Sequence, residues 1–148
     1  MTTKVEDVTM RSQNFTIRNS KLKVVTINNI LLIEDNPADA HLVRYFLEET
    51  DLVSCEITHK LCLKDALETL ASGKQFDAIL CDLTLPDSRG FETLERLMAE
   101  FPDSNVIVQT GLSDRELGLM AIRAGAQDFL VKGAYDPHDL GKTLRYSI

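Results

Sequence analysis

The sequence FDAILCDLTLPDSRG, from Phe76 to Gly90, combines a strand, an acid and a turn in one short segment. Its apolar run at 78–81 is typical of a strand that is buried on both faces, and the run ends on Asp82. Turn-forming residues follow at 86–90, before a helical apolar stripe begins. Ligands of open α/β sheets bind where such strands end. Taken alone, Asp82 is explained equally well as a turn residue.

The same alternation of strand and helix runs through the rest of the chain. Further short apolar or alternating runs lie at 30–33, 55–59, 106–110 and 129–131, and each is followed by an apolar stripe at helical spacing. Parallel strands need crossover helices, and right-handed crossovers cover both faces of a sheet. The pattern therefore predicts an α/β fold: a doubly wound (βα)5, flavodoxin-like three-layer sandwich with parallel strand order 2-1-3-4-5.

Start signals support the predicted helices. Asn36 and Asp136 are each followed by a proline and, two residues later, by an acid, which is a typical helix start; residues 113–116 form a capping box. We expect Leu42, Phe46 and Leu47 to form the core face of the first helix. Leu117, Met120, Ala121 and Ala124 form the corresponding stripe of the fourth.

Composition limits the classes of function. The chain has 148 residues, of which 44% are hydrophobic and 26% charged, which predicts one globular domain. It contains no apolar run long enough for a membrane span and no secretory signal. Three cysteines without a Cys-x-x-Cys motif indicate reduced thiols, so we expect a cytoplasmic protein without a membrane partner.

Charge divides the chain into two parts. Residues 1–28 carry five basic and two acidic side chains, which is a net charge of +3. Because the total net charge is −7, residues 29–148 carry −10. An acidic body argues against direct binding of nucleic acid. We expect residues 1–28 to be an N-terminal extension and residues 29–148 to be the domain; the alternation at 22–27 fits an added edge strand or a lead-in.

Polar side chains stand where the predicted strands end: Glu34 and Asp35, Asp82, Thr110 and Lys132. These ends share one edge of a parallel sheet. Carboxylates so close together repel one another unless a cation intervenes, and an all-oxygen cluster suits Mg²⁺. A carboxylate, Mg²⁺, a hydroxyl and an ammonium are the groups needed to accept a phosphoryl group.

The chain resembles the receiver domain of bacterial two-component response regulators over about residues 30–148. The resemblance rests on four dispersed motifs: LLIEDNPAD, ILCDLTLPDSRG, VIVQTG and FLVKG. It implies that Asp82 is the phosphoacceptor and that Asp35, Asp82 and the backbone carbonyl of Thr84 bind Mg²⁺. It further implies that Glu34 acts largely through water, that Thr110 and Lys132 contact the phosphoryl group, and that Phe129 is the aromatic switch.

The resemblance also implies partners. A sensor histidine kinase or a histidine phosphotransfer protein would supply the phosphoryl group, and a downstream effector or output domain would respond. The face made by the fourth helix, fifth strand and fifth helix would dock the effector or form a homodimer. The domain would catalyse its own aspartyl phosphorylation and dephosphorylation without turning over an external substrate.

Two positions depart from the family pattern: Gly111 replaces the usual alanine, and Gly133 replaces the usual proline.

Two other functions account for parts of this pattern. An aspartyl-nucleophile phosphatase would need a second acid two residues after Asp82, where this chain has Thr84. A receiver-like module that only binds proteins, without phosphorylation, would have no need of the acid pair, Asp82, Thr110 and Lys132. The sequence leaves open whether the chain is a stand-alone receiver or a piece of a longer protein.

Overall fold

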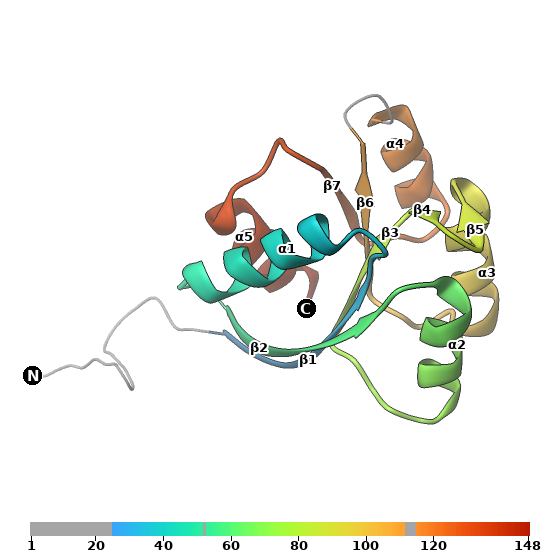
Figure 1. Ribbon diagram of the computed structural model, residues 1–148, viewed down its shortest axis with the longest axis horizontal. Helices are drawn as coiled ribbons and strands as arrows, with labels where there is room; N and C mark the ends of the chain where they lie inside the picture. The colour runs from blue at the N-terminus through green and yellow to red at the C-terminus, as the bar shows by residue number, and fades with distance from the viewer. Residues whose placement is uncertain (1–24, 52, 112–114) are drawn as a thin grey trace, which may run out of the picture.

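The computed structural model describes residues 25–51, 53–111 and 115–148. Their main sheet has five parallel strands in the order β2-β1-β3-β6-β7, which is the predicted order when the main strands are counted along the chain (Figure 1). The strands are β1 (Val25–Ile33), β2 (Val53–Lys60), β3 (Ala78–Asp82), β6 (Val106–Thr110) and β7 (Asp128–Val131). The predicted doubly wound α/β fold is therefore confirmed.

Helices cover both faces of the sheet. Helices α1 (Pro37–Glu49) and α5 (Pro137–Ser147) lie on one face, and α2 (Leu63–Ala71), α3 (Phe91–Glu100) and α4 (Arg115–Arg123) lie on the other (Figure 1). One hydrophobic core fills each side, and all five residues of the central strand β3 are buried. None of the described helices has the length and apolarity that crossing a membrane requires.

Strand β1 begins earlier than the apolar run at 30–33 indicates. It pairs with β2 from Val25 opposite Val53 onward, with an irregular register between Thr26 and Asn29. Residues 25–27 are thus the first part of β1, next to the edge strand β2, and not a separate edge strand. Residues 22–24 lie outside the described part of the chain.

Two expected core positions are wrong. Leu42 is 41% exposed, because the buried positions of α1 are Ala40, Val43 and Leu47, which share one face at 100° per residue. Met120 is 46% exposed for the same reason, since α4 turns its neighbours Gly118 and Ala121 inward.

The helix starts are partly confirmed. Asn36 caps α1 by accepting the N–H of Asp39, and Asp136 caps α5 in a full capping box with Asp139. The capping box expected before α4 begins at Ser113, which lies outside the described residues.

A short hairpin follows β3 that the sequence pattern did not predict. It pairs β4 (Thr84–Leu85) with β5 (Ser88–Arg89) in antiparallel fashion. Its turn residue Asp87 accepts the N–H groups of Leu63 and Lys64, each at 2.9 Å. These are the first residues of α2, whose own cap residue Cys62 makes no side-chain cap bond. The hairpin therefore ties the segment after Asp82 to the start of α2.

Candidate functional site

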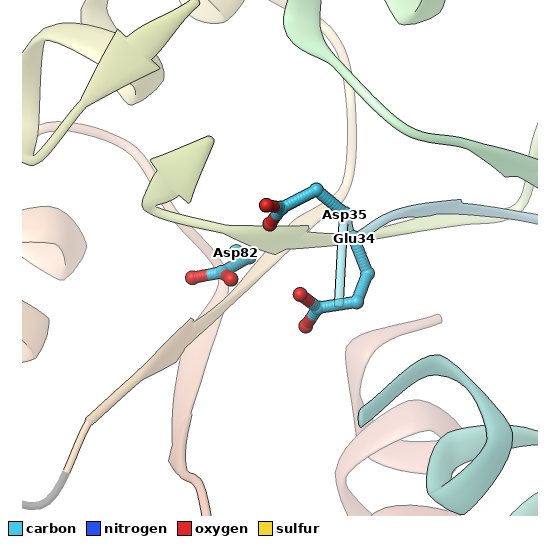
Figure 2. A group of neighbouring side chains, drawn as sticks. All are labelled: Glu34, Asp35 and Asp82. Carbon is cyan, nitrogen blue, oxygen red and sulfur yellow. The ribbon is translucent and has the colours of Figure 1, made fainter. Parts of the chain in front are cut away.

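Three carboxylates meet where β1 and β3 end. β1 leads directly into Glu34 and Asp35, and β3 ends on Asp82, in the neighbouring strand. One oxygen from each carboxylate lies within 4.8 Å of the others, and Figure 2 shows the three groups converging. Glu34 is fully buried and Asp82 is 7% exposed, whereas Asp35 is exposed. The acid pair and the third-strand aspartate thus form one cluster, as the strand order predicts.

The ammonium of Lys132 enters the same cluster. Its Nζ lies 2.9 Å from Oδ2 of Asp82 and 2.8 Å from Oε1 of Glu34. Burial lowers the pKa of Lys132, but hydrogen bonds to Glu34, Asp82 and Asp39 more than offset that effect, so the net shift is upward. Lys132 therefore stays a cation beside Asp82.

Gly133, which stands where the family usually has proline, leaves the Lys132 ammonium next to Asp82. Gly133 has φ +80°, a left-handed conformation that glycine adopts without strain, and no cis peptide bond occurs among the described residues. A trans, left-handed glycine at this position is compatible with an ammonium directed at Asp82.

Asp39 is a site residue that the sequence reasoning missed. Its Oδ2 lies 2.9 Å from Nζ of Lys132, although the two residues are 93 positions apart. The sequence around it is that of an ordinary first-turn acid of α1. Nothing local distinguishes such an acid from one that reaches a lysine on another element.

Both oxygens of the Glu34 carboxylate are engaged. Oε1 pairs with Lys132, and Oε2 accepts the N–H of Asn36 at 3.2 Å. Burial raises the pKa of Glu34 to about 7, because the hydrogen bond from Lys132 only partly offsets the desolvation and the nearby Asp82 charge adds to it. Without a further cation, Glu34 is therefore partly protonated near neutral pH.

The carboxylate of Asp82 is held from two sides. Oδ1 accepts the N–H of Thr84 at 3.0 Å, while Oδ2 faces Lys132. Thr84 itself is exposed at the start of β4. Its backbone is thus fixed next to the acid cluster, which is where a carbonyl ligand to a cation would have to be.

Thr110 ends β6 at the same edge of the sheet. It is 2% exposed, and its Oγ1 has no hydrogen-bond partner among the described residues. Its carbonyl accepts the N–H of Lys132 at 2.8 Å, so the hydroxyl-bearing and ammonium-bearing residues are joined through the backbone. A buried hydroxyl without a partner is unusual and is suited to an incoming acceptor.

Phe129 lies on β7 and is half-buried against the core on the α4 side. Its ring contacts α4 at Gly118. The resemblance implies an aromatic switch at this position, and the structure shows that the ring lies against Gly118 of α4.

The oxygen donors of this cluster fit a hard divalent cation. Asp35 offers an exposed carboxylate, Asp82 is next to it, and the set contains neither sulfur nor imidazole. Magnesium, which needs only one or two carboxylates and water, is compatible with this set.

Comparison with known proteins agrees with these features. The family model of the response regulator receiver domain matches residues 30–145 of this chain. The regulatory protein LuxO of Vibrio cholerae is 33% identical over 101 residues, which are 68% of this chain and 21% of LuxO. TorR, the TorCAD operon transcriptional regulatory protein of Escherichia coli, is 31% identical over 106 residues, or 71% of this chain and 44% of TorR. The chain spans less than half the length of these curated relatives.

Solved structures share the fold. A response regulator receiver domain protein from Clostridium thermocellum superposes with a TM-score of 0.71 at 22% identity, over 82% of this chain and 94% of that one. The Mn²⁺-bound form of response regulator Rcp1 superposes with a TM-score of 0.63 at 24% identity, over 80% of this chain and 89% of that one.

Proposed function

Since this chain belongs to the response regulator receiver domain family, whose general function is phosphoryl transfer to an aspartate, we propose that Asp82 is its phosphoacceptor. The observation that carries the proposal is the position of the Asp82 carboxylate, 2.9 Å from Lys132 and within the same cluster as Glu34 and Asp35. Receiver domains interact with histidine kinases and output domains. For this chain, the donor would be the phosphohistidine of a sensor kinase or of a histidine phosphotransfer protein.

In the reaction, a carboxylate oxygen of Asp82 attacks phosphorus in line while the donor imidazole leaves. The Thr84 N–H holds one carboxylate oxygen, which orients the other for attack. Lys132 neutralises negative charge that develops on the phosphoryl oxygens. The Thr110 hydroxyl, buried and without a partner among the described residues, donates to one of these oxygens.

Receiver domains bind Mg²⁺ at an acidic pocket. In this chain Asp35, Asp82 and the carbonyl of Thr84 would hold the ion directly, and Glu34 would act through water, because both of its carboxylate oxygens are already engaged. The bound ion supplies charge neutralisation at the phosphoryl group. A Mn²⁺-bound relative of the same fold supports a divalent ion in this family.

The output would leave through the face formed by α4, β7 and α5. Movement of Thr110 toward the phosphoryl group would allow Phe129 to change position, and that face would then dock an effector or form a homodimer. We assign residues 29–148 to the receiver domain and residues 1–28 to an extension, and we expect the domain to act in the cytoplasm.

Phosphorylation-independent protein binding is the second candidate function. It would account for the fold and for an exposed docking face, but it would leave the contact between Lys132 and Asp82 without a purpose. Turnover of external phosphoesters has less support, because Thr84 occupies the position of the second acid.

Labelling with acetyl phosphate tests the proposal. Intact-mass analysis should show one added phosphoryl group in the presence of Mg²⁺ and none with EDTA. Asp82→Asn should abolish the addition, whereas Asp87→Asn, a matched change in the neighbouring hairpin, should retain it. Undiminished labelling of Asp82→Asn would show that the phosphoacceptor is another residue.

A further inference from the structure

Lys132 is shared by three carboxylates, and only two of them belong to the acid cluster. Its Nζ lies 2.8 Å from Oε1 of Glu34 and 2.9 Å from Oδ2 of both Asp82 and Asp39. The ammonium donates hydrogen bonds to Asp39 and Asp82, and it forms an ion pair with Glu34. The third partner, Asp39, comes from α1 and not from a strand end.

The position of Asp39 is itself fixed. Its N–H donates to Oδ1 of Asn36 at 3.0 Å, and Pro37 opens the helix ahead of it. An acid in the first helical turn is favoured by the helix dipole. The Asp39 side chain is 40% exposed and that of Lys132 only 24%, so Asp39 is the more solvent-exposed partner of the contact.

We infer that Asp39 is a positioning residue for phosphoryl transfer to Asp82: it holds the Lys132 ammonium beside the attacking carboxylate. This inference rests on the proposed function. Lysine has a flexible four-carbon stem, and without Asp39 one donor would turn to water and the ammonium would occupy several positions. Charge neutralisation depends on an ammonium that is already in place when the phosphoryl group arrives.

Asp39 serves the transfer of the phosphoryl group to Asp82. An oxygen of Asp82 forms a bond to phosphorus, the bond from phosphorus to the donor breaks, and the electron pair stays on the donor. With acetyl phosphate the leaving group is acetate, and with phosphohistidine it is imidazole. Asp39 exchanges no proton and contacts no reacting atom; it acts only through Lys132.

A simple charge effect predicts the opposite sign. Asp39 adds a negative charge near the place where an anionic donor must approach, so removing that charge alone should speed phosphorylation. If Asp39 instead positions Lys132, removing it should slow the reaction. We expect a loss of about 10-fold, less than the 10²-fold that a 1 Å misplacement can cost.

The experiment measures the rate constant of acetyl phosphate labelling by intact mass at saturating Mg²⁺. Asp39→Asn should slow labelling about 10-fold, mainly in the maximal rate and not in the half-saturating donor concentration. Glu92→Gln, which neutralises an exposed first-turn acid of α3, should change the rate less than about 2-fold. Faster labelling of Asp39→Asn would overturn the inference.

A double-mutant cycle separates positioning from a loss of stability. In a Lys132→Ala background, Asp39→Asn should have no further effect on the rate, because the group on which it acts is gone. An equal loss in both backgrounds would overturn the inference. If labelling of Lys132→Ala is too slow to be timed, the same cycle is measured with the affinity for beryllofluoride, determined by ¹⁹F NMR. If Asp39→Asn does not fold, Asp39→Ser is used in its place.

Failure of the proposed function is recognised independently. In that case the wild-type protein shows no labelling that depends on Asp82, whatever residue stands at position 39. If labelling depends on Asp82 but not on Asp39, only the positioning role is lost.

Discussion

The ring of Phe129 fills the space that a side chain at Gly118 would occupy. A Cβ built on Gly118 would lie 2.4 Å from Cδ2 and 2.7 Å from Cγ of the Phe129 ring, closer than real Cβ contacts. Gly118 is buried inside α4, where glycine costs about 1 kcal/mol relative to alanine. The glycine therefore allows the ring at the proposed switch position to lie directly against the α4 backbone.

Gly118→Ala should consequently fail to stabilise the protein. An ordinary helix-interior replacement would gain about 1 kcal/mol in the free energy of unfolding, but overpacking against the ring should cost about 1–3 kcal/mol. We expect a net loss in urea unfolding and shifted NMR signals of the Phe129 ring. The control is the same substitution in a Phe129→Ala background, where the gain of about 1 kcal/mol should return. Stabilisation by Gly118→Ala alone would mean that the ring moves away at no cost.

The two acids at the end of β1 should contribute unequally to Mg²⁺ binding. Asp35 is exposed, whereas Glu34 has both carboxylate oxygens engaged by Lys132 and Asn36. Calorimetric titration should show that Asp35→Asn weakens Mg²⁺ binding by about 100-fold or more, and Glu34→Gln by about 10-fold. Glu92→Gln should leave the affinity unchanged. Equal losses for the two acids would mean that Glu34 also binds the ion directly.

The burial of Glu34 predicts a pH dependence of stability. Burial raises the pKa of Glu34 from its ordinary value of 4.5 to about 7 in the folded state. Between these values the folded protein holds a proton that the unfolded chain has released, so in EDTA the contribution of Glu34 to stability falls as pH rises from 5 to 7. The full difference corresponds to about 3 kcal/mol at most.

Urea unfolding at several pH values measures this effect. The free energy of unfolding should depend on pH clearly less in Glu34→Gln than in the wild type. In Glu92→Gln it should depend on pH as in the wild type. Saturating Mg²⁺ should flatten the wild-type curve as well, because a nearby cation lowers the pKa of Glu34. Parallel curves for Glu34→Gln and the wild type in EDTA would refute the assignment.

Asp87 should stabilise the protein through α2. It accepts the N–H groups of Leu63 and Lys64, and the cap residue Cys62 does not replace these bonds. Asp87→Ala should lower the free energy of unfolding by about 1 kcal/mol, as expected for a lost helix cap. Glu68→Gln, which breaks the exposed ion pair with Lys64, should cost less than about 0.5 kcal/mol. A smaller loss for Asp87→Ala than for this control would argue against the cap.

Patterns local to one element predicted most of this molecule. The apolar run at 78–81 predicts a buried strand, and β3 is fully buried. A cap residue followed by a proline and an acid predicts the starts of α1 and α5. Contacts between distant segments were not predictable. Asp39 and Lys132 are separated by 93 residues, and Asp87 reaches α2 across 24, so neither bond leaves a periodic trace in the sequence. Leu42 was misassigned because two overlapping faces of α1 contain apolar residues, and only packing selects between them.

The route from the phosphoryl group to the distant face should depend on the Thr110 hydroxyl. That hydroxyl has no partner among the described residues, so Thr110→Ala should cost little stability. Beryllofluoride, a mimic of the phosphoryl group, should shift NMR signals of α4, β7 and α5 in the wild type. In Thr110→Ala it should still bind at Asp82 but shift those distant signals much less, because nothing draws position 110 toward the site and Phe129 keeps its seat at Gly118. Thr69→Ala, which removes a hydroxyl of α2 that donates to the Asp65 carbonyl, should leave the response intact. A full distant response in Thr110→Ala would show that another element carries the signal.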